Sequence, residues 1–294
     1  MSEHEQGPET DGVTALAGST LAIVGAGIMA ESIIGGLLAK AMIPAQQIVA
    51  SHPRADRRTA LEKRFGIRSV ERNADAVNGA NLVALTVKPQ VVGGVMRELR
   101  DVLTEDQVVM SILAGATLAT LEQGLGHQRI VRVMPNTPAQ IGEGMSVWCA
   151  TPAVDAAERA KVRAALGALG EELEVETEKY VDMATALSGT GPTYVFLMME
   201  ALVDAGVHMG FPRRIAEEIV LQTVGGSVAF ARSSGKHLAE LRNMVTSPGG
   251  TSAEAIYQME KGGLRTVLSK SVYAAYQRTQ TLALEQEKKV NAGG

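Results

Sequence analysis

The sequence predicts an α/β protein in two parts, a parallel β-sheet with crossover helices followed by a purely helical part. From Leu21 to about Glu176, short β-rich runs alternate with stretches of helical spacing. After about Lys179 only helical patterns follow. The length of 294 residues also favours two domains over a single core.

The expected strands are short β-rich runs, and some of them, such as Leu82–Val87, are apolar on both faces, which is typical of buried parallel strands. They cover Leu21–Val24, Ile48–Ser51, Leu82–Val87, Val108–Leu113, Ile130–Met134, Ser146–Cys149 and Leu173–Glu176. Apolar residues at helical spacing predict helices between them, over Met29–Ala41, Arg57–Phe65, Val91–Leu103 and Ala156–Leu169.

The helical part contains a segment around Tyr194 that is apolar on all sides. One stripe carries Val195, Met198, Met199, Leu202, Val203 and Gly206, and Phe196, Leu197 and Ala201 fill the other face. Such a helix must be covered all round. The helical part could cover it alone, but a subunit interface explains it more simply, so we expect a homodimer through this part.

Composition excludes several classes of function. A net charge of −4 and 3% aromatic residues argue against nucleic-acid binding. The single cysteine, Cys149, excludes an intrachain disulfide framework, and the five scattered histidines predict no metal site. The first residues are acidic and resemble no signal peptide, and no apolar run is long enough to span a membrane. We therefore expect a cytoplasmic protein.

A glycine turn follows the first expected strand directly and opens a helix. Gly25 permits the tight turn, and Gly27 lets the backbone approach a pyrophosphate. The free amides at the helix start, from Ile28 and Met29 onward, suit phosphate oxygens. Ala30 replaces the third glycine of the usual fingerprint. In this context the turn predicts a dinucleotide site, with a purely structural turn as the alternative.

The end of the second expected strand predicts which dinucleotide binds. An NAD enzyme places a carboxylate there, whereas this strand ends at Ser51 and is followed by Arg54. A hydroxyl and a guanidinium suit a 2′-phosphate, so we expect NADPH, with NADH possible but less preferred. The alternative for Arg54, and still more for Arg57 and Arg58, is a solvated basic helix start.

Four further segments carry a resemblance that extends over almost the whole chain from residue 19. They are Val87–Gln90 (VKPQ), Arg132–Pro138 (RVMPNTP), Leu187–Pro192 (LSGTGP) and Val245–Ser252 (VTSPGGTS). In this order, behind the glycine turn, they resemble the pyrroline-5-carboxylate reductase family. The resemblance implies NADPH-dependent reduction of 1-pyrroline-5-carboxylate to L-proline, the last step of proline biosynthesis.

The same resemblance implies the domain organisation. We expect a Rossmann-type NADP-binding domain over 19–178 and an all-α substrate-binding and dimerisation domain over 179–294. The resemblance also implies that such dimers often assemble into a decamer of five dimers. The acidic composition of the first residues, apart from the resemblance, predicts a disordered leader over residues 1–18.

The resemblance also assigns cofactor contacts beyond the glycine turn. Val87, Lys88 and Pro89 would line the nicotinamide ribose, at the strand edge where open α/β sheets bind ligands. Asn136 would face the nicotinamide amide, and Asn73 would lie near the adenosine ribose or its phosphate. Lys88 could instead be an exposed strand-end lysine, and Asn73 an ordinary helix cap.

The strongest substrate signal lies between Ser247 and Glu254. Thr251 and Glu254 match a capping box, so a helix is predicted to start here. Gly249 and Gly250, just ahead of it, leave amides open for the carboxylate of a small imino acid. We expect Ser247, Gly249, Gly250, Thr251 and Ser252 to bind substrate, with a bare helix cap and glycine hinge as the alternative.

Catalysis needs one hydroxyl near the imine nitrogen, to donate or stabilise its proton. Ser252 is at the position of the motif that implies this role, where most family members carry threonine.

Two rival functions share parts of the pattern. A β-hydroxyacid dehydrogenase would carry a lysine on the first long helix of the helical part, where none occurs, and a non-catalytic NADP-binding sensor would not need Ser247–Ser252.

Overall fold

The computed structural model describes residues 15–292. The chain forms two compact units. The first comprises the residues up to Thr190 together with the chain from Ala275 onward, and the second runs from Gly191 to Ala274. The functional division predicted between residues 178 and 179 stays a prediction, because compactness does not show where cofactor and substrate bind.

Most of the predicted leader, residues 1–14, lies outside the described residues. Residues 15–18, however, belong to the folded first unit. Leu16 is only 1% exposed and packs in the same core cluster as Leu21 and Ile33. The leader was therefore predicted too long, because an apolar side chain near its end contributes to the core.

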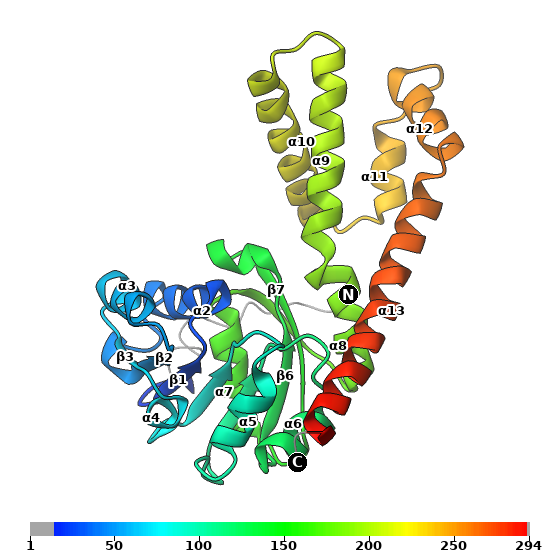
Figure 1. Cartoon of the computed structure of the whole chain (residues 1–294). Coiled ribbons are helices and arrows are strands. Elements are labelled where there is room, and N and C mark those ends of the chain that lie inside the picture. The colour runs from blue at the N-terminus through cyan, green and yellow to red at the C-terminus, as the bar shows by residue number, and fades with distance from the viewer. Residues whose placement is uncertain (1–14, 293–294) are drawn as a thin grey trace. The chain divides into compact units, whose positions relative to one another are not determined.

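The first unit is built on an eight-stranded sheet, which confirms the predicted fold class (Figure 1). Its strands lie in the order β3-β2-β1-β4-β5-β6-β7-β8. All neighbouring pairs are parallel except β6 and β7, which are antiparallel. Their bounds are β1 (Leu21–Val24), β2 (Ile48–Ser51), β3 (Arg68–Val70), β4 (Leu82–Leu85), β5 (Val108–Ser111), β6 (Ile130–Met134), β7 (Gly144–Ala150) and β8 (Gly170–Glu174).

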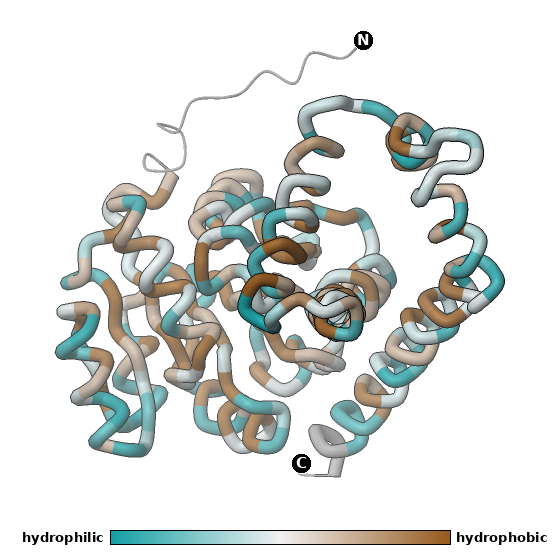
Figure 2. The backbone as a smooth tube through the Cα atoms, turned by 90° about the horizontal axis from the view of Figure 1, so that it is seen from above, coloured by the Kyte–Doolittle hydropathy of each residue, from teal (hydrophilic) through white to brown (hydrophobic). Residues whose placement is uncertain are grey.

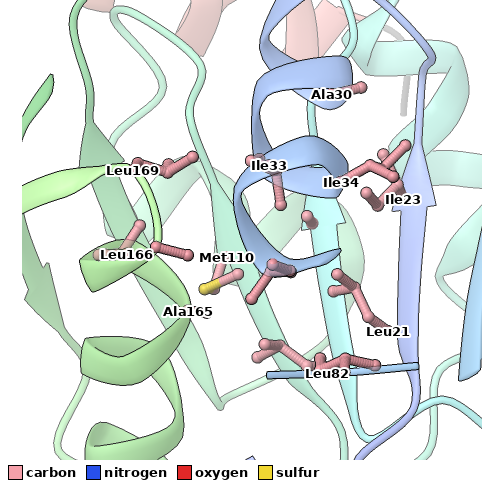
Figure 3. Close-up of a cluster of buried hydrophobic side chains, with 14 of the residues drawn as sticks. Leu21, Ile23, Ala30, Ile33, Ile34, Leu82, Met110, Ala165, Leu166 and Leu169 are labelled. Carbon is pink, nitrogen blue, oxygen red and sulfur yellow. The ribbon is translucent and has the colours of Figure 1, made fainter. Parts of the chain in front are cut away.

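Alternate side chains of the central strands enter two separate cores, one on each face of the sheet. Leu21 and Ile23 of β1 join the first core, and Ala22 and Val24 join the second. Figure 3 shows part of the first core, where helical side chains such as Ile34 lie against the strands. Burial on both faces explains why these strands are apolar runs in the sequence.

The helices of the first unit divide between these two cores. Side chains of α2 (Ile28–Ala39), α3 (Ala55–Phe65) and α7 (Ala156–Gly167) enter the first core. Those of α4 (Asn73–Val77), α5 (Val92–Leu99) and α6 (Leu118–Leu125) enter the second. Three short one-turn segments also belong to this unit, η1 (Ala45–Gln47), η2 (Thr137–Ile141) and the π-helical turn η3 (Thr185–Gly189) that follows α8 (Glu178–Ala184).

The sequence reading missed β3, α4 and α6. Strand β3 has three residues, none of them buried, so it gives no apolar run. Helix α4 has only five residues, too few to show a period. Strand β8 begins at Gly170 rather than at Leu173. Glu171 and Leu173 are exposed while Glu172 and Glu174 are half-buried, so the polar and apolar residues of this strand do not follow its burial.

The second unit is helical, as predicted, and no strand occurs between residues 179 and 292. It contains α9 (Gly191–His208), α10 (Arg213–Ser234), α11 (Leu238–Met244), α12 (Thr251–Lys261) and the beginning of α13 (Leu264–Ala292). Helices α9 and α10 form a hairpin in which a Cβ at Gly206 would lie 3.0 Å from Cβ of Ala216. Arg213 and Asp204 pair across the hairpin at 2.7 Å.

This unit leaves most of its apolar side chains exposed. Within Gly191–Ala274 only Val203, Gly206 and Ala216 are buried. Brown apolar positions recur along the helices in Figure 2. Exposed apolar residues of α9 and α10 include Val195, Phe196, Leu197, Met198, Leu202, Ile219, Leu221, Val228 and Phe230. The helical part therefore does not cover its own apolar surface, which leaves the subunit interface as the explanation.

Among residues 15–292, the helices include none that combines the length and apolar character needed to cross a membrane.

Candidate active site

The glycine turn between β1 and α2 is shaped by Gly25. Its φ of +94° lies in the region that favours glycine. A Cβ there would also lie 2.6 Å from Cγ1 and 2.9 Å from the backbone nitrogen of Val87. Glycine is thus required at position 25 for two reasons: the positive φ disfavours other residues, and Val87, after β4, leaves no room for a Cβ. Val87 is therefore placed against the turn, beside the predicted phosphate site.

The rest of the turn is open. A Cβ at Gly27 would meet no atom within 4 Å. The amides of Gly27, Ile28 and Met29 have no hydrogen-bond partner among residues 15–292, and the side chain of Ile28 is 64% exposed. Free amides at the start of a helix of 12 residues, under an unfilled surface, are the features that a bound diphosphate requires.

Ser51 and Asn73, both predicted to contact the cofactor, are hydrogen-bonded to each other. The Ser51 hydroxyl donates to Oδ1 of Asn73 at 2.7 Å, and Ser51 is fully buried. The Asn73 amide group donates in turn to Oε2 of Glu98 at 2.7 Å. In this structure the Ser51 hydroxyl therefore supports Asn73 and is not open to a ligand.

Asn73 is not the helix cap that was considered as its alternative role. The cap of α4 is Arg72, and Asn73 is the first helical residue. Glu98 accepts hydrogen bonds from the backbone amides of Asn73 and Ala74 at 3.0 and 3.3 Å, so a carboxylate from α5 performs the capping.

Of Arg54, Arg57 and Arg58, only Arg54 has a largely exposed side chain. Its side chain is 70% exposed and pairs with Asp56, with Nε 3.1 Å from Oδ1. This hydrogen bond holds the pKa of Asp56 below its usual value. Arg58 is instead bound to the backbone carbonyls of His52 and Pro53, at 2.8 and 2.9 Å. The sequence analysis did not predict this pairing of Arg54 with Asp56.

Burial shifts the pKa of two ionisable groups near the strands. Burial lowers the pKa of His52, whose Nδ1 accepts a hydrogen bond from the Arg54 amide at 3.1 Å. Burial also raises the pKa of the Cys149 thiol to about 11, so it stays protonated at neutral pH and is no nucleophile.

Within the described part of the chain, no group of three or more His, Cys, Asp or Glu side chains could hold a metal ion.

Lys88 and Pro89 follow β4 at the same sheet edge as the glycine turn. Lys88 is exposed. The carbonyl of Pro89 accepts a hydrogen bond of 3.5 Å from Nε2 of Gln286, which lies on the part of α13 that belongs to the first unit. Thr86, just before them, donates its hydroxyl proton to the carbonyl of Gly25, so the two loops are joined.

Asn136 follows β6, two strands further along this edge. Its Oδ1 accepts from the amide of Met145 at 2.9 Å, and its Nδ2 donates to Oγ of Ser188 at 3.2 Å. The side chain is therefore fixed from both ends. Ser188 belongs to the LSGTGP segment, so the structure gives that segment a role that the sequence did not: it orients Asn136 through the turn η3.

A buried arginine holds α8, the helix that leads into this turn. Arg132 of β6 has a fully buried side chain, and its two terminal nitrogens bind Glu178 and Asp182 of α8, each at 2.6 Å. Glu178 also accepts from the amide of Leu118 at 2.7 Å. The signal was present in the sequence as a single charge within the apolar run Ile130–Met134, because such a charge requires a partner.

In the second unit, α12 begins at Thr251, as predicted. The capping box is wrong, however: the cap is Gly250, whose backbone is extended and whose carbonyl accepts the amides of Ala253 and Glu254 at 3.1 and 3.3 Å. Thr251 is then already inside the helix, and Glu254 accepts instead from Gln258 at 2.9 Å.

The loop ahead of α12 is folded over its glycines. Gly249 has a φ of +69°, and the amide of Gly250 donates to the carbonyl of Ser247 at 3.0 Å. The amides of Thr251 and Ser252 have no hydrogen-bond partner among the described residues. Without the capping box these two donors remain open, which favours an anion here more strongly than the predicted cap did.

The predicted cofactor residues of the first unit lie at or after the carboxyl ends of β1, β2, β4 and β6, along one edge of a mostly parallel sheet. Asn73 is joined to this edge by its hydrogen bond with Ser51 at the end of β2. Ligands of open α/β sheets bind at this edge. Fold and site define a dinucleotide-dependent oxidoreductase with a helical second part.

Comparison with known proteins narrows this class. Residues 178–282 match a family described as pyrroline-5-carboxylate reductase dimerisation, and residues 20–115 match one described as NADP oxidoreductase coenzyme F420-dependent. The pyrroline-5-carboxylate reductase of Pseudomonas aeruginosa is 43% identical over 264 residues, which cover 90% of this chain and 96% of that protein.

Solved structures agree. A pyrroline-5-carboxylate reductase from Coxiella burnetii matches with a TM-score of 0.85 and 34% identity, over 90% of this chain and 98% of that one. The Plasmodium falciparum pyrroline carboxylate reductase with NADP bound matches with a TM-score of 0.83 and 29% identity, over the same shares of the two chains. This chain belongs to the pyrroline-5-carboxylate reductase family.

Proposed function

We propose that this protein reduces 1-pyrroline-5-carboxylate to L-proline with NADPH, as the last step of proline biosynthesis, with NADH as a less preferred donor. The observation that carries the proposal is the 43% identity across 90% of the chain to a relative named for this reaction. The same family membership disfavours the two rivals, a β-hydroxyacid dehydrogenase and an NADP-binding sensor. Consistent with this, α9 contains no lysine.

The first unit would hold the cofactor. Gly25, Gly27, Ile28 and Met29 form the open helix start that suits the pyrophosphate. The exposed guanidinium of Arg54 is proposed to exchange Asp56 for a 2′-phosphate. The residues proposed to support or line the remaining contacts are Ser51, Asn73, Val87, Lys88, Pro89 and Asn136.

The second unit would hold the substrate. The free amides of Thr251 and Ser252 suit the carboxylate of the imino acid, and the folded loop Ser247–Gly250 presents them. NADPH, when bound, supplies a hydride from its nicotinamide ring. Ser252 is proposed to donate or stabilise the proton at the imine nitrogen, because a protonated imine accepts hydride far more readily.

Assembly and location follow the same reasoning. The exposed apolar side chains of α9 and α10 support a homodimer through the helical part. We propose a decamer of five such dimers as the larger assembly, and the cytoplasm as the location.

An absorbance assay tests the proposed reaction. NADPH should be consumed on addition of pyrroline-5-carboxylate, with one proline formed for each NADPH oxidised and with kcat/KM in the range of roughly 10⁴–10⁸ M⁻¹ s⁻¹ that enzymes usually reach. A 3-hydroxyacid with NADP⁺ is the control and should give no NADPH. Reduction of NADP⁺ by the hydroxyacid, with no consumption of NADPH by the imine, would overturn the proposal.

A further inference from the structure

Arg57, on the first turn of α3, binds the glycine turn rather than solvent. Its Nε donates to the carbonyl of Ala26 at 2.9 Å, and a terminal nitrogen pairs with Glu31 on α2. The side chain of Arg57 is 30% exposed and that of Glu31 18%. The contact joins the segment after β2 to the segment after β1, across 31 positions of sequence.

The carbonyl of Ala26 shares one peptide plane with the amide of Gly27. Because this plane is rigid and trans, its carbonyl and its N–H point in opposite directions. A donor that holds the carbonyl on the side of α3 therefore holds the Gly27 amide facing the other way. Glycine itself offers little resistance to a peptide flip, because it has no Cβ.

The guanidinium is not free to act as a phosphate ligand. Glu31 neutralises its charge, and the second carboxylate oxygen of Glu31 pairs with Arg64 near the end of α3. Arg64 in turn lies over the ring of Phe65, 4.8 Å from its centroid. Arg57 is thus bound on both sides by protein, by a backbone carbonyl and by a carboxylate that is itself anchored.

We infer that Arg57 is a positioning residue for the dinucleotide turn: with Glu31 it locks the Ala26–Gly27 peptide so that the Gly27 amide is presented to the cofactor pyrophosphate. This inference rests on the proposed function and adds a residue to it. It separates two roles among the basic residues after β2, since Arg54 reads the 2′-phosphate and Arg57 sets the turn that both NADPH and NADH share.

Titration of NADPH and of NADH into the full-length protein, without imine, distinguishes these roles. Arg57→Met should weaken both cofactors by the same factor, roughly tenfold, because a charge-assisted hydrogen bond to the turn is lost. Arg54→Met should weaken NADPH alone. Lys63→Met is the matched control: it removes an exposed charge from the same helix and should change neither affinity.

Two more variants separate positioning from charge and from general damage. Arg57→Lys should recover part of the affinity for both cofactors, since an ammonium can still reach one of the two acceptors. Glu31→Gln should weaken both cofactors, because Arg57 loses its anchor. If Arg57 acted as a bare charge near the phosphates, Glu31→Gln would tighten binding instead. The midpoint of thermal unfolding and KM for the imine should stay near the Lys63→Met values.

The affinities of the Arg57 variants test the positioning role, and the affinity of the unsubstituted protein tests the proposed function. Selective loss of NADPH in Arg57→Met would make Arg57 a phosphate ligand, and unchanged affinities would make it a bystander; either result overturns the positioning role. Failure of the unsubstituted protein to bind either cofactor would instead refute the proposed function.

Discussion

Arg132→Met is expected to lower the free energy of unfolding by about 3 kcal/mol, at the low end of the range for breaking a buried ion pair. The side chain of Arg132 is fully buried, and its loss leaves the carboxylates of Glu178 and Asp182 without their cation. Those carboxylates are 27% and 20% exposed, so water offsets part of the cost. Urea unfolding monitored by circular dichroism measures the loss.

The matched control is Arg278→Met, which breaks the ion pair between Arg278 and Glu285. The side chain of Arg278 is 59% exposed. Its effect should stay below about 1 kcal/mol. A triple variant, Arg132→Met with Glu178→Gln and Asp182→Asn, should recover much of the loss because no unpaired charge remains. Equal losses in the two single variants would show that burial of Arg132 does not matter.

The Arg132 variant should also weaken cofactor binding. Arg132 fixes α8, α8 leads into the turn η3, and Ser188 of this turn accepts the hydrogen bond from Asn136. A loosened α8 therefore leaves the Asn136 side chain with only one of its two fixed partners. KM for NADPH should rise, while KM for the imine should change little.

Ser252→Ala is expected to lower kcat by roughly a hundredfold, the lower end of what a positioned proton donor contributes. Ser252 is half-buried on the first turn of α12, and its hydroxyl makes no hydrogen bond with the described residues, so it is available to a ligand. Steady-state kinetics with pyrroline-5-carboxylate measure kcat, and NADPH titration should give an unchanged affinity.

Ser252→Thr serves as the control. It keeps the hydroxyl and introduces the threonine that the family resemblance predicts at this position, so kcat should remain close to that of the unsubstituted protein. Unchanged turnover in Ser252→Ala would remove this hydroxyl from the mechanism, and weakened NADPH binding in the same variant would show that the change is not confined to the substrate site.

The helices and strands that show a clear local pattern of apolar residues could be predicted from the sequence. The central strands are apolar on both faces, so their positions follow from burial alone, and β1, β2 and β6 have the predicted bounds. Edge strand β3 shows no apolar run, because side chains on a half-exposed edge are not selected for burial. The sequence reading therefore found the core of the sheet and missed its margin.

The site shows the same limit. The turn at Gly25 and the start of α12 are local features, and both were predicted. Contacts between distant segments were not: Ser51 is buried under Asn73, and Arg57 binds Ala26. The capping box failed for another reason, because a Thr-x-x-Glu pattern is equally compatible with threonine as the cap and as the first helical residue.

Transfer of the label from NADPH that carries deuterium at both hydrogens of the nicotinamide C4 tests the central claim most directly. If this protein delivers hydride to the C=N bond of pyrroline-5-carboxylate, proline should carry one deuterium, on the ring carbon that was doubly bonded to nitrogen. Mass spectrometry and proton NMR of the product locate it. Proline without deuterium, or NADPH that loses its label only to solvent, would contradict direct hydride transfer.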